Sequence, residues 1–173
     1  GLVLALDAAN TKSYPGSGTT WYDLSGNTFN GSLFNSPTFN SDNAGSIVFD
    51  GSNDYVIADL PSINSAHTVM LWIYANNGLP TITGSSTGTV TPLKGNGHWN
   101  PGIWLGNNKI RGHAATKYSD YTGISWSAAA WHLIGQVYNG TSLDLIVDGE
   151  VVTPTSTANY SPGIPSQVLI GIE

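Results

Sequence analysis

Hydrophobic and polar residues alternate in short runs along most of the chain, a spacing typical of β-strands that bury one face. Clusters of Gly, Asn, Pro and Ser separate these runs and indicate turns. Helical spacing is almost absent, and the one helix-friendly patch, residues 127–130, is too short to form a helix alone. The pattern predicts ten strands: Leu2–Ala8, Ser46–Phe49, Asp54–Ala58, His67–Tyr74, Gly102–Leu105, Lys109–Ala114, Trp131–Tyr138, Ser142–Val147, Glu150–Thr153 and Gln167–Ile172.

Two hairpins are well specified by their turn residues. Asp148-Gly149 lies between two strand-like runs and favours the tight turn whose central residues both have positive φ. Residues 106–108, Gly-Asn-Asn, form a second turn of the same kind. Residues 76–100 are rich in Gly, Ser and Thr, and they predict a long loop, which in a compact domain is usually functional.

Many short strands between turn signals predict an all-β domain, either a sandwich or a barrel. The 173 residues fit one domain, and neither an internal repeat nor a domain boundary is visible. A hydrophobic fraction of 40% supplies a sizeable core without disulfides, which the absence of Cys excludes.

Charge changes this picture by excluding some partners. Only 9% of the residues are charged and the net charge is −6, a composition that favours an extracellular or particle-surface protein. Nucleic-acid binding requires clustered cations, and no apolar run is long enough for membrane insertion. The five basic residues are mostly scattered along the sequence: Lys12, Lys94, Lys109, Arg111 and Lys117.

Several segments resemble, in the same order, those of laminin-G-like domains of the concanavalin A-like superfamily. The resemblance covers nearly the whole chain, and it implies an antiparallel two-sheet β-sandwich of the jelly-roll type that spans residues 1–173. The matching segments are 18–27 (GTTWYDLSGN), 30–33 (NGSL), 46–56 (SIVFDGSNDYV), 68–74 (TVMLWIY), 131–134 (WHLI) and 143–149 (LDLIVDG).

The opening residues 4–16 resemble versions of this domain found in structural proteins of tailed bacterial viruses. This resemblance implies a non-enzymatic virion domain, either a capsid decoration or a tail-fibre module, that contacts other virion or assembly proteins. The alternative is an extracellular lectin-type module that binds a cell-surface glycan. Family members usually continue beyond residues 169–171 to a last strand that pairs near the first. The chain is therefore expected either to be truncated or to receive its closing strand from a partner.

The resemblance also allows a glycosidase. Glycosidases of this fold class carry paired carboxylates on one strand, which act as acid and nucleophile. This sequence has two Glu, Glu150 beside a turn and Glu173, so the paired pattern is missing. Residues 84–88 match G-x-S-x-G, but the strand and helix that a nucleophile elbow needs are not predicted around them. We therefore expect no enzymatic activity.

A tight loop at residues 50–54 is the candidate metal site. Asp50, Asn53 and Asp54 bring oxygen-bearing side chains together, and hard cations such as Ca²⁺ prefer oxygen ligands. The alternative, which we favour, is a β-turn whose side chains cap backbone groups.

The aromatic residues supply the candidate ligand site. The resemblance assigns Trp72 and Trp131 to core segments, and Trp21 is expected to pack beneath its turn. The remaining aromatic side chains between residues 98 and 126 could bind a glycan or a receptor, although packing under the long loop explains the same residues. The candidates are His98, Trp99, Trp104, Tyr118 and Tyr121.

Overall fold

The computed structural model describes residues 1–61, 63, 66–76, 90–95, 100–106, 109–124, 126–159 and 166–172. These residues form an all-β fold in which every strand pairing is antiparallel. A short 3-10 helix, η1, covers Asp42–Ala44. The strands are β1 (Thr20–Trp21), β2 (Gly31–Phe34), β3 (Thr38–Asn40), β4 (Ser46–Val48), β5 (Tyr55–Asp59), β6 (His67–Ala75), β7 (Val90–Gly95), β8 (Gly102–Gly106), β9 (Lys109–Ala114), β10 (Lys117–Thr122), β11 (Ala130–Tyr138), β12 (Leu143–Val147), β13 (Glu150–Val152), β14 (Ser156–Asn159) and β15 (Gln167–Ile172).

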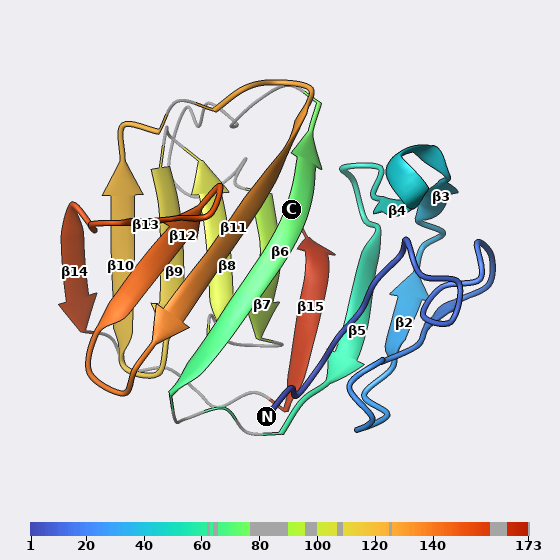
Figure 1. Cartoon of the computed structure of the whole chain (residues 1–173), viewed down its shortest axis with the longest axis horizontal. Coiled ribbons are helices and arrows are strands. Elements are labelled where there is room, and N and C mark those ends of the chain that lie inside the picture. The colour runs from blue at the N-terminus through green and yellow to red at the C-terminus, as the bar shows by residue number, and fades with distance from the viewer. Residues whose placement is uncertain are drawn as a thin grey trace.

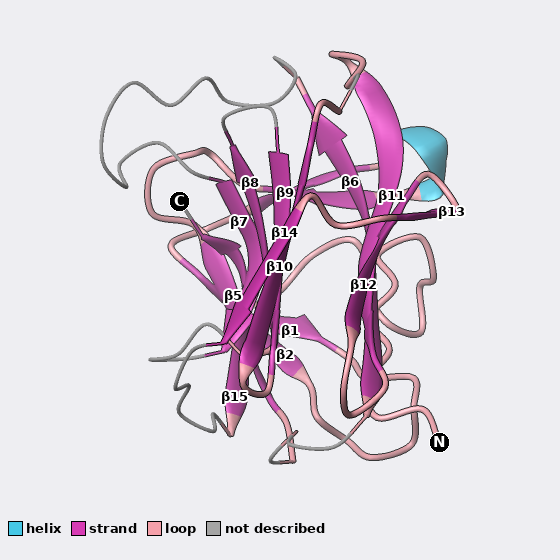
Figure 2. Ribbon diagram, turned by 90° about the vertical axis from the view of Figure 1, so that its left-hand side faces the viewer, coloured by secondary structure: helices cyan, strands magenta, loops and turns pink. Residues whose placement is uncertain are grey.

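Two large sheets lie face to face. One has nine strands in the order β1-β2-β5-β15-β7-β8-β9-β10-β14, and the other has four in the order β13-β12-β11-β6. Figure 1 looks onto the four-stranded sheet, with strands of the larger sheet behind it. Figure 2 shows the two layers nearly edge-on. Strands β3 and β4 form a separate small sheet.

The main core cluster joins the two sheets. Ile103, Leu105 and Ile110 come from β8 and β9, and they pack with Ile134 of β11 and Leu145 of β12. All five side chains are 0–2% exposed. Because successive strand residues point to opposite faces, alternate side chains of each of these strands fill the space between the layers.

The predicted strands are largely confirmed from residue 46 onward, with boundary shifts of one or two residues. The first prediction was wrong, because Leu2–Ala8 forms no strand. This segment is held by side chains of a turn: Ala5 N donates to Asp23 Oδ1 at 2.9 Å, and Asn27 Nδ2 donates to Val3 O at 3.0 Å. The apolar side chains of the segment still reach the interior, since Leu4 and Leu6 pack against a buried cluster.

Several strands were not predicted. β7 lies within the stretch expected to be a loop, and β10 carries the sequence KYSDYT, whose polar residues hide its alternation. β14 is also polar and β2 has only four residues, and they lie toward the two edges of the nine-stranded sheet. Strands of this kind are formed by pairing with their neighbours rather than by their own hydrophobic pattern.

The hairpin at Asp148-Gly149 is confirmed, with φ values of 51° and 89°. Asp148 also stabilises the first residues of β11. Its Oδ2 lies 2.8 Å from His132 Nδ1, and its Oδ1 accepts the Leu133 N–H at 3.0 Å. His132 is buried and stacks on Trp126 at 4.1 Å between ring centroids, so its role is structural. The second turn includes residues 107 and 108, which lie outside the described residues, although β8 and β9 on either side of it are paired.

The assignment of Trp72 and Trp131 to the core was wrong. On β6, Val69, Leu71 and Ile73 pack against the interior, so the side chain of Trp72 points outward and is 66% exposed. Trp131 pairs with Tyr74 across β11 and β6 and packs against its ring on the same outer face. Trp21, by contrast, packs against a buried cluster as expected.

Gly171 in β15 occupies a position that accepts no other residue without strain. Its φ is +79°, in the left-handed region, and a Cβ atom there would overlap the ring of Phe49. Gly149 has a similar φ of +89° but has open space where its Cβ would be.

Replacing Gly171 by Ala should therefore lower the free energy of unfolding by roughly 2–5 kcal/mol, because left-handed strain and overlap with Phe49 add together. Gly149→Ala is the matched control and should cost only about 1–2 kcal/mol, since it carries the strain without the overlap. Chemical denaturation of both variants measures the difference. Equal losses would show that Phe49 does not restrict position 171.

Candidate functional site

Two of the candidate aromatic residues share the outer face of the nine-stranded sheet. Trp104 of β8 is paired with Arg111 of β9, and Arg111 is paired with Asp120 of β10. The Arg111 guanidinium carbon lies 5.5 Å from the Trp104 ring centroid and 4.3 Å from that of Tyr118. Strand pairing thus places a cation between two aromatic rings that are 14 residues apart in the sequence.

Asp120 binds both basic side chains of this cluster. Arg111 donates to the carboxylate from Nε and, at 2.7 Å, from Nη2, while Lys109 Nζ lies 3.4 Å from Oδ2. Burial alone would raise the pKa of Asp120, but the hydrogen bonds and charges of Arg111 and Lys109 outweigh it and lower the pKa. The same hydrogen bond raises the pKa of Arg111. The Asp120 carboxylate is therefore compensated within the protein and needs no ligand to satisfy it, although the two cations outnumber it.

His113 lies beside this cluster and is 7% exposed. Its ring centroid is 5.8 Å from that of Tyr118. Burial, and secondarily the positive charge of Arg111, lowers the pKa of His113 to about 4. The imidazole is therefore neutral at physiological pH.

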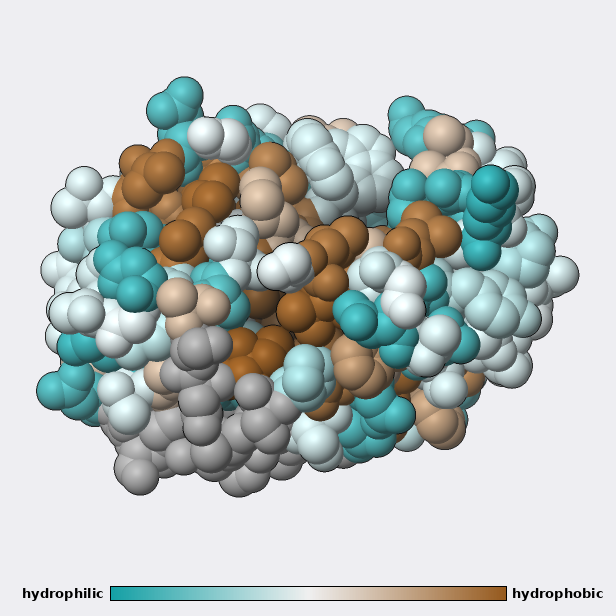
Figure 3. All heavy atoms as spheres, turned by 60° about the horizontal axis from the view of Figure 1, so that its bottom comes forward, coloured by the Kyte–Doolittle hydropathy of each residue, from teal (hydrophilic) through white to brown (hydrophobic). Residues whose placement is uncertain are grey.

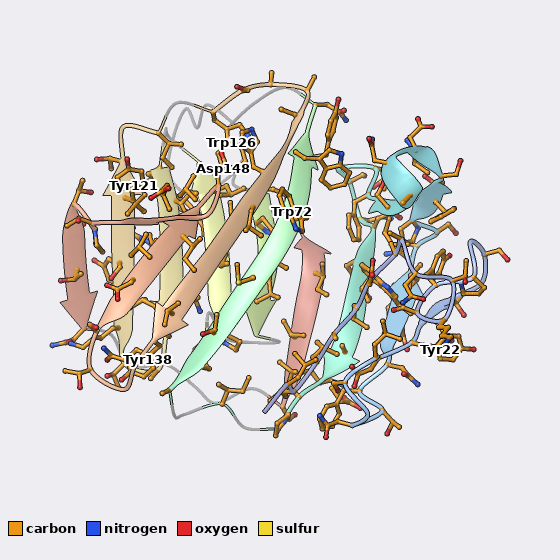
Figure 4. The ribbon with its side chains drawn as sticks, viewed as in Figure 1. Tyr22, Trp72, Tyr121, Trp126, Tyr138 and Asp148 are labelled. Atoms are coloured by element: carbon orange, nitrogen blue, oxygen red, sulfur yellow. The ribbon has the colours of Figure 1, made fainter. Side chains whose placement is uncertain are left out.

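Of the other candidate residues, Tyr121 is described and does not join this face. Tyr121 points to the opposite side of β10, where it packs against the main core cluster together with Trp126. Figure 4 shows Tyr121 and Trp126 toward the same end of the sandwich. His98 and Trp99 lie outside the described residues.

The loop at residues 50–54 has the hydrogen bonds of a turn. Asp50 Oδ1 accepts from Ser52 N at 2.9 Å and from Asn53 N at 3.2 Å, and Asp54 Oδ2 accepts from Asp50 N at 3.1 Å. The bonds from the Ser52 and Asn53 N–H groups lower the pKa of Asp50. Within the part of the chain that the structure describes, no group of three or more His, Asp or Glu side chains could hold a metal ion.

A cavity of about 320 Å³ opens beside this loop. Asp54 lines it and is only 6% exposed, and its second carboxylate oxygen, Oδ1, is buried without a hydrogen-bond partner among the residues that the structure describes. Tyr55 lines it as well and stacks on Phe34, with ring centroids 4.9 Å apart and planes 11° apart. The lining residues are Asn35, Ser52, Asn53, Asp54, Tyr55, Leu169 and Gly171.

Sequence reasoning identified the loop but not the cavity. Asn35 belongs to the turn after β2 and donates from Nδ2 to Asn53 O at 2.6 Å, which joins two segments 18 residues apart. Leu169 and Gly171 come from β15, which pairs with β5. Only the strand order brings these residues together, and no local motif could have predicted it.

No family model matches the sequence, and no curated protein matches it. Among solved structures, the chain is similar to the crystal structure of botulinum neurotoxin serotype D binding domain, with a TM-score of 0.61 and 14% sequence identity. The match covers 91% of this chain and 42% of that chain, so this chain spans less than half the length of its structural neighbour. At this identity the similarity shows the shared fold alone. The structure has no membrane-crossing helix among the residues it describes.

A pH dependence of stability follows from His113. Its pKa of about 4 lies below the ordinary value of 6.5, so between these pH values the unfolded chain binds a proton that the folded chain does not. Stability should fall as the pH falls through this window, by roughly 2–3 kcal/mol between pH ~7 and pH ~4.5. Asp120 also contributes to the pH dependence. Because its pKa is lowered, protonation of Asp120 destabilises the fold only at pH values below this window.

The measurement is urea unfolding at both pH values for the wild type and for His113→Gln. The variant has no titrating ring and should lose this part of the pH dependence. An unchanged pH dependence in the variant would exclude His113 as its source.

Proposed function

We propose that this chain is a non-catalytic binding module that holds a hydroxyl-rich ligand, such as a pyranose ring of a glycan, in the cavity beside Asp54. The observation that carries the proposal is the buried Asp54 Oδ1, which has no hydrogen-bond partner in the described part of the chain. A buried acceptor without a partner is costly, and a ligand that donates a hydrogen bond would remove that cost.

The composition of the cavity favours a neutral ring with hydroxyl groups. Asn35, Asn53 and Ser52 offer both donors and acceptors, Asp54 offers an acceptor, and Tyr55 and Leu169 form apolar walls. Sites for small polar ligands commonly combine apolar walls with a few placed polar groups. The volume of about 320 Å³ suits one sugar ring. Calcium is a second candidate occupant, because Asp50, Asn53 and Asp54 carry oxygen atoms, and the binding test below includes it.

The setting we propose is the surface of a virion or of another extracellular assembly, where the domain contacts assembly proteins and a cell-surface glycan. The laminin-G-like resemblance of the sequence and the low content of charged residues support this setting. The two facing sheets agree with a concanavalin A-like jelly roll, and the structural neighbour is named a binding domain. The non-catalytic part rests on the sequence, which has Glu150 and Glu173 but no paired carboxylates on one strand.

Asp54→Asn tests the proposal with little change in shape. The amide oxygen can still accept from Asp50 N, while an NH₂ group replaces the acceptor Oδ1. Sugar binding should weaken roughly 10–100-fold, because a hydrogen bond to a charged group is lost and a donor faces a donor. Titration calorimetry or amide NMR shifts with a panel of monosaccharides and with CaCl₂ measures the effect.

Asp59→Asn is the matched control, because Asp59 ends strand β5, which begins directly after Asp54, is exposed, and accepts from Gln167 at 2.9 Å outside the cavity. The control should bind like the wild type. The proposal fails if no sugar shifts the amide signals of residues 50–55, or if Asp54→Asn binds as well as Asp59→Asn. Shifts at these residues with calcium alone would assign the cavity to the metal.

A further inference from the structure

The outer face of the four-stranded sheet is apolar and open. Along β6, the outward side chains of Met70, Trp72 and Tyr74 are 50%, 66% and 44% exposed, and on β13 Val151 is 67% exposed. Figure 4 shows Trp72 about halfway along β6, the edge strand of this sheet. These are four of the nine large hydrophobic residues found exposed in the described chain, and all four lie on one sheet.

The neighbouring strands extend this surface. The register places Met70, Gly135, Ile146 and Val151 in one row across the sheet, so they share its outer side. The edge-to-face contact between Tyr74 and Trp131, with centroids 5.5 Å apart, continues the apolar surface from β6 to β11. Figure 3 shows hydrophobic side chains gathered toward the upper left of the molecule, over this sheet. We call this surface the apolar face; its residues are Met70, Trp72, Tyr74, Trp131, Leu133, Val137, Ile146 and Val151.

The apolar face departs from the usual pattern of antiparallel sheets, in which the solvent side carries polar residues. At the described outward positions of its four strands, Asp144 is the one charged residue. A sheet that is hydrophobic on both sides is normally covered on both sides, because exposing such a surface to water is unfavourable.

The size of the apolar face is informative about what covers it. A large aromatic side chain can bury 150–250 Å². The exposed fractions of the side chains on the apolar face therefore correspond to roughly 500 Å² of accessible surface in total. Two such faces in contact would bury about 1,000 Å², which is the lower limit for a specific but weak protein interface.

We propose that the apolar face is the contact surface of a homodimer, in which two copies pack their four-stranded sheets against each other. Twisted sheets of the same hand pack closely face to face, so a second copy offers both the matching shape and the matching chemistry. A glycan fits this surface less well, because the aliphatic side chains of Leu133, Val137 and Ile146 offer no hydrogen bonds to hydroxyl groups. This inference concerns a different face from the Asp54 cavity and does not depend on the proposed function.

Analytical ultracentrifugation of the whole chain over a concentration series tests the proposal. The wild type should show a reversible monomer–dimer equilibrium within the range of about 0.01–1 mM. Trp72→Ser and Tyr74→Ser should each weaken dimerisation at least about tenfold, because large aromatic residues supply much of the binding energy of such interfaces. Raising the salt concentration should strengthen it, since each copy carries a net charge of −6.

Tyr22→Ser is the matched control. Tyr22 is 47% exposed, close to the 44% of Tyr74, and Figure 4 shows it far from Trp72, at the other end of the molecule. The control should dimerise like the wild type, and thermal melts of all variants verify that they fold. A wild type that stays monomeric at about 1 mM would overturn the proposal and leave the apolar face to a different partner. Higher aggregates without a dimer, or equal effects of Tyr22→Ser and Tyr74→Ser, would overturn it as well.

Discussion

Burial of alternate side chains between two facing sheets is the constraint on which the remaining features depend. Ile134 of β11 and Leu145 of β12 meet Ile103, Leu105 and Ile110 from the opposite sheet, and all are nearly inaccessible to water. Once these side chains point inward, the residues between them must point outward. The position of Arg111 between two aromatic rings on one outer face and the exposure of Trp72 on the other are both consequences of this alternation.

The two buried carboxylates of the nine-stranded sheet and its loops differ in how they are satisfied. Asp120 accepts hydrogen bonds from Arg111 and Lys109, which compensate for its removal from water. Asp54 accepts one backbone hydrogen bond and, within the described residues, retains an oxygen without a partner. A carboxylate whose oxygens all accept hydrogen bonds holds its neighbours in place. A carboxylate with an oxygen that accepts none favours the binding of a group that can donate a hydrogen bond to it. This difference directs the functional proposal to Asp54, although the aromatic residues around Asp120 are more conspicuous in the sequence.

The sequence predicted those elements that are determined by a few neighbouring residues. The alternation in β11 and the Asp148-Gly149 turn are encoded within a few residues, and both were predicted correctly. The direction of Trp72 could have been derived from its own strand, because Val69, Leu71 and Ile73 already occupy the inward positions. The prediction failed because the resemblance to core segments of a family was given more weight than the alternation.

The cavity and the cation cluster could not have been predicted from local patterns. Asn35, Asp54 and Leu169 meet only because β2, β5 and β15 are neighbours in the sheet. Lys109 and Arg111 looked scattered in the sequence, yet strand pairing directs both to Asp120. Strand order is a property of the whole fold, and a hydrophobic pattern read one strand at a time does not contain it.

The attachment of the N-terminal segment has a mechanical consequence. Residues 2–5 are fastened to the rest of the domain by separate hydrogen bonds from the turn at residues 23–27, not by a continuous ladder with a neighbouring strand. Strands in a ladder resist sliding because many bonds must break together, whereas isolated bonds break one after another. A pulling force applied at the first residues would therefore break these bonds one at a time, while the packing of Leu4 and Leu6 resists further detachment and both large sheets keep their pairing.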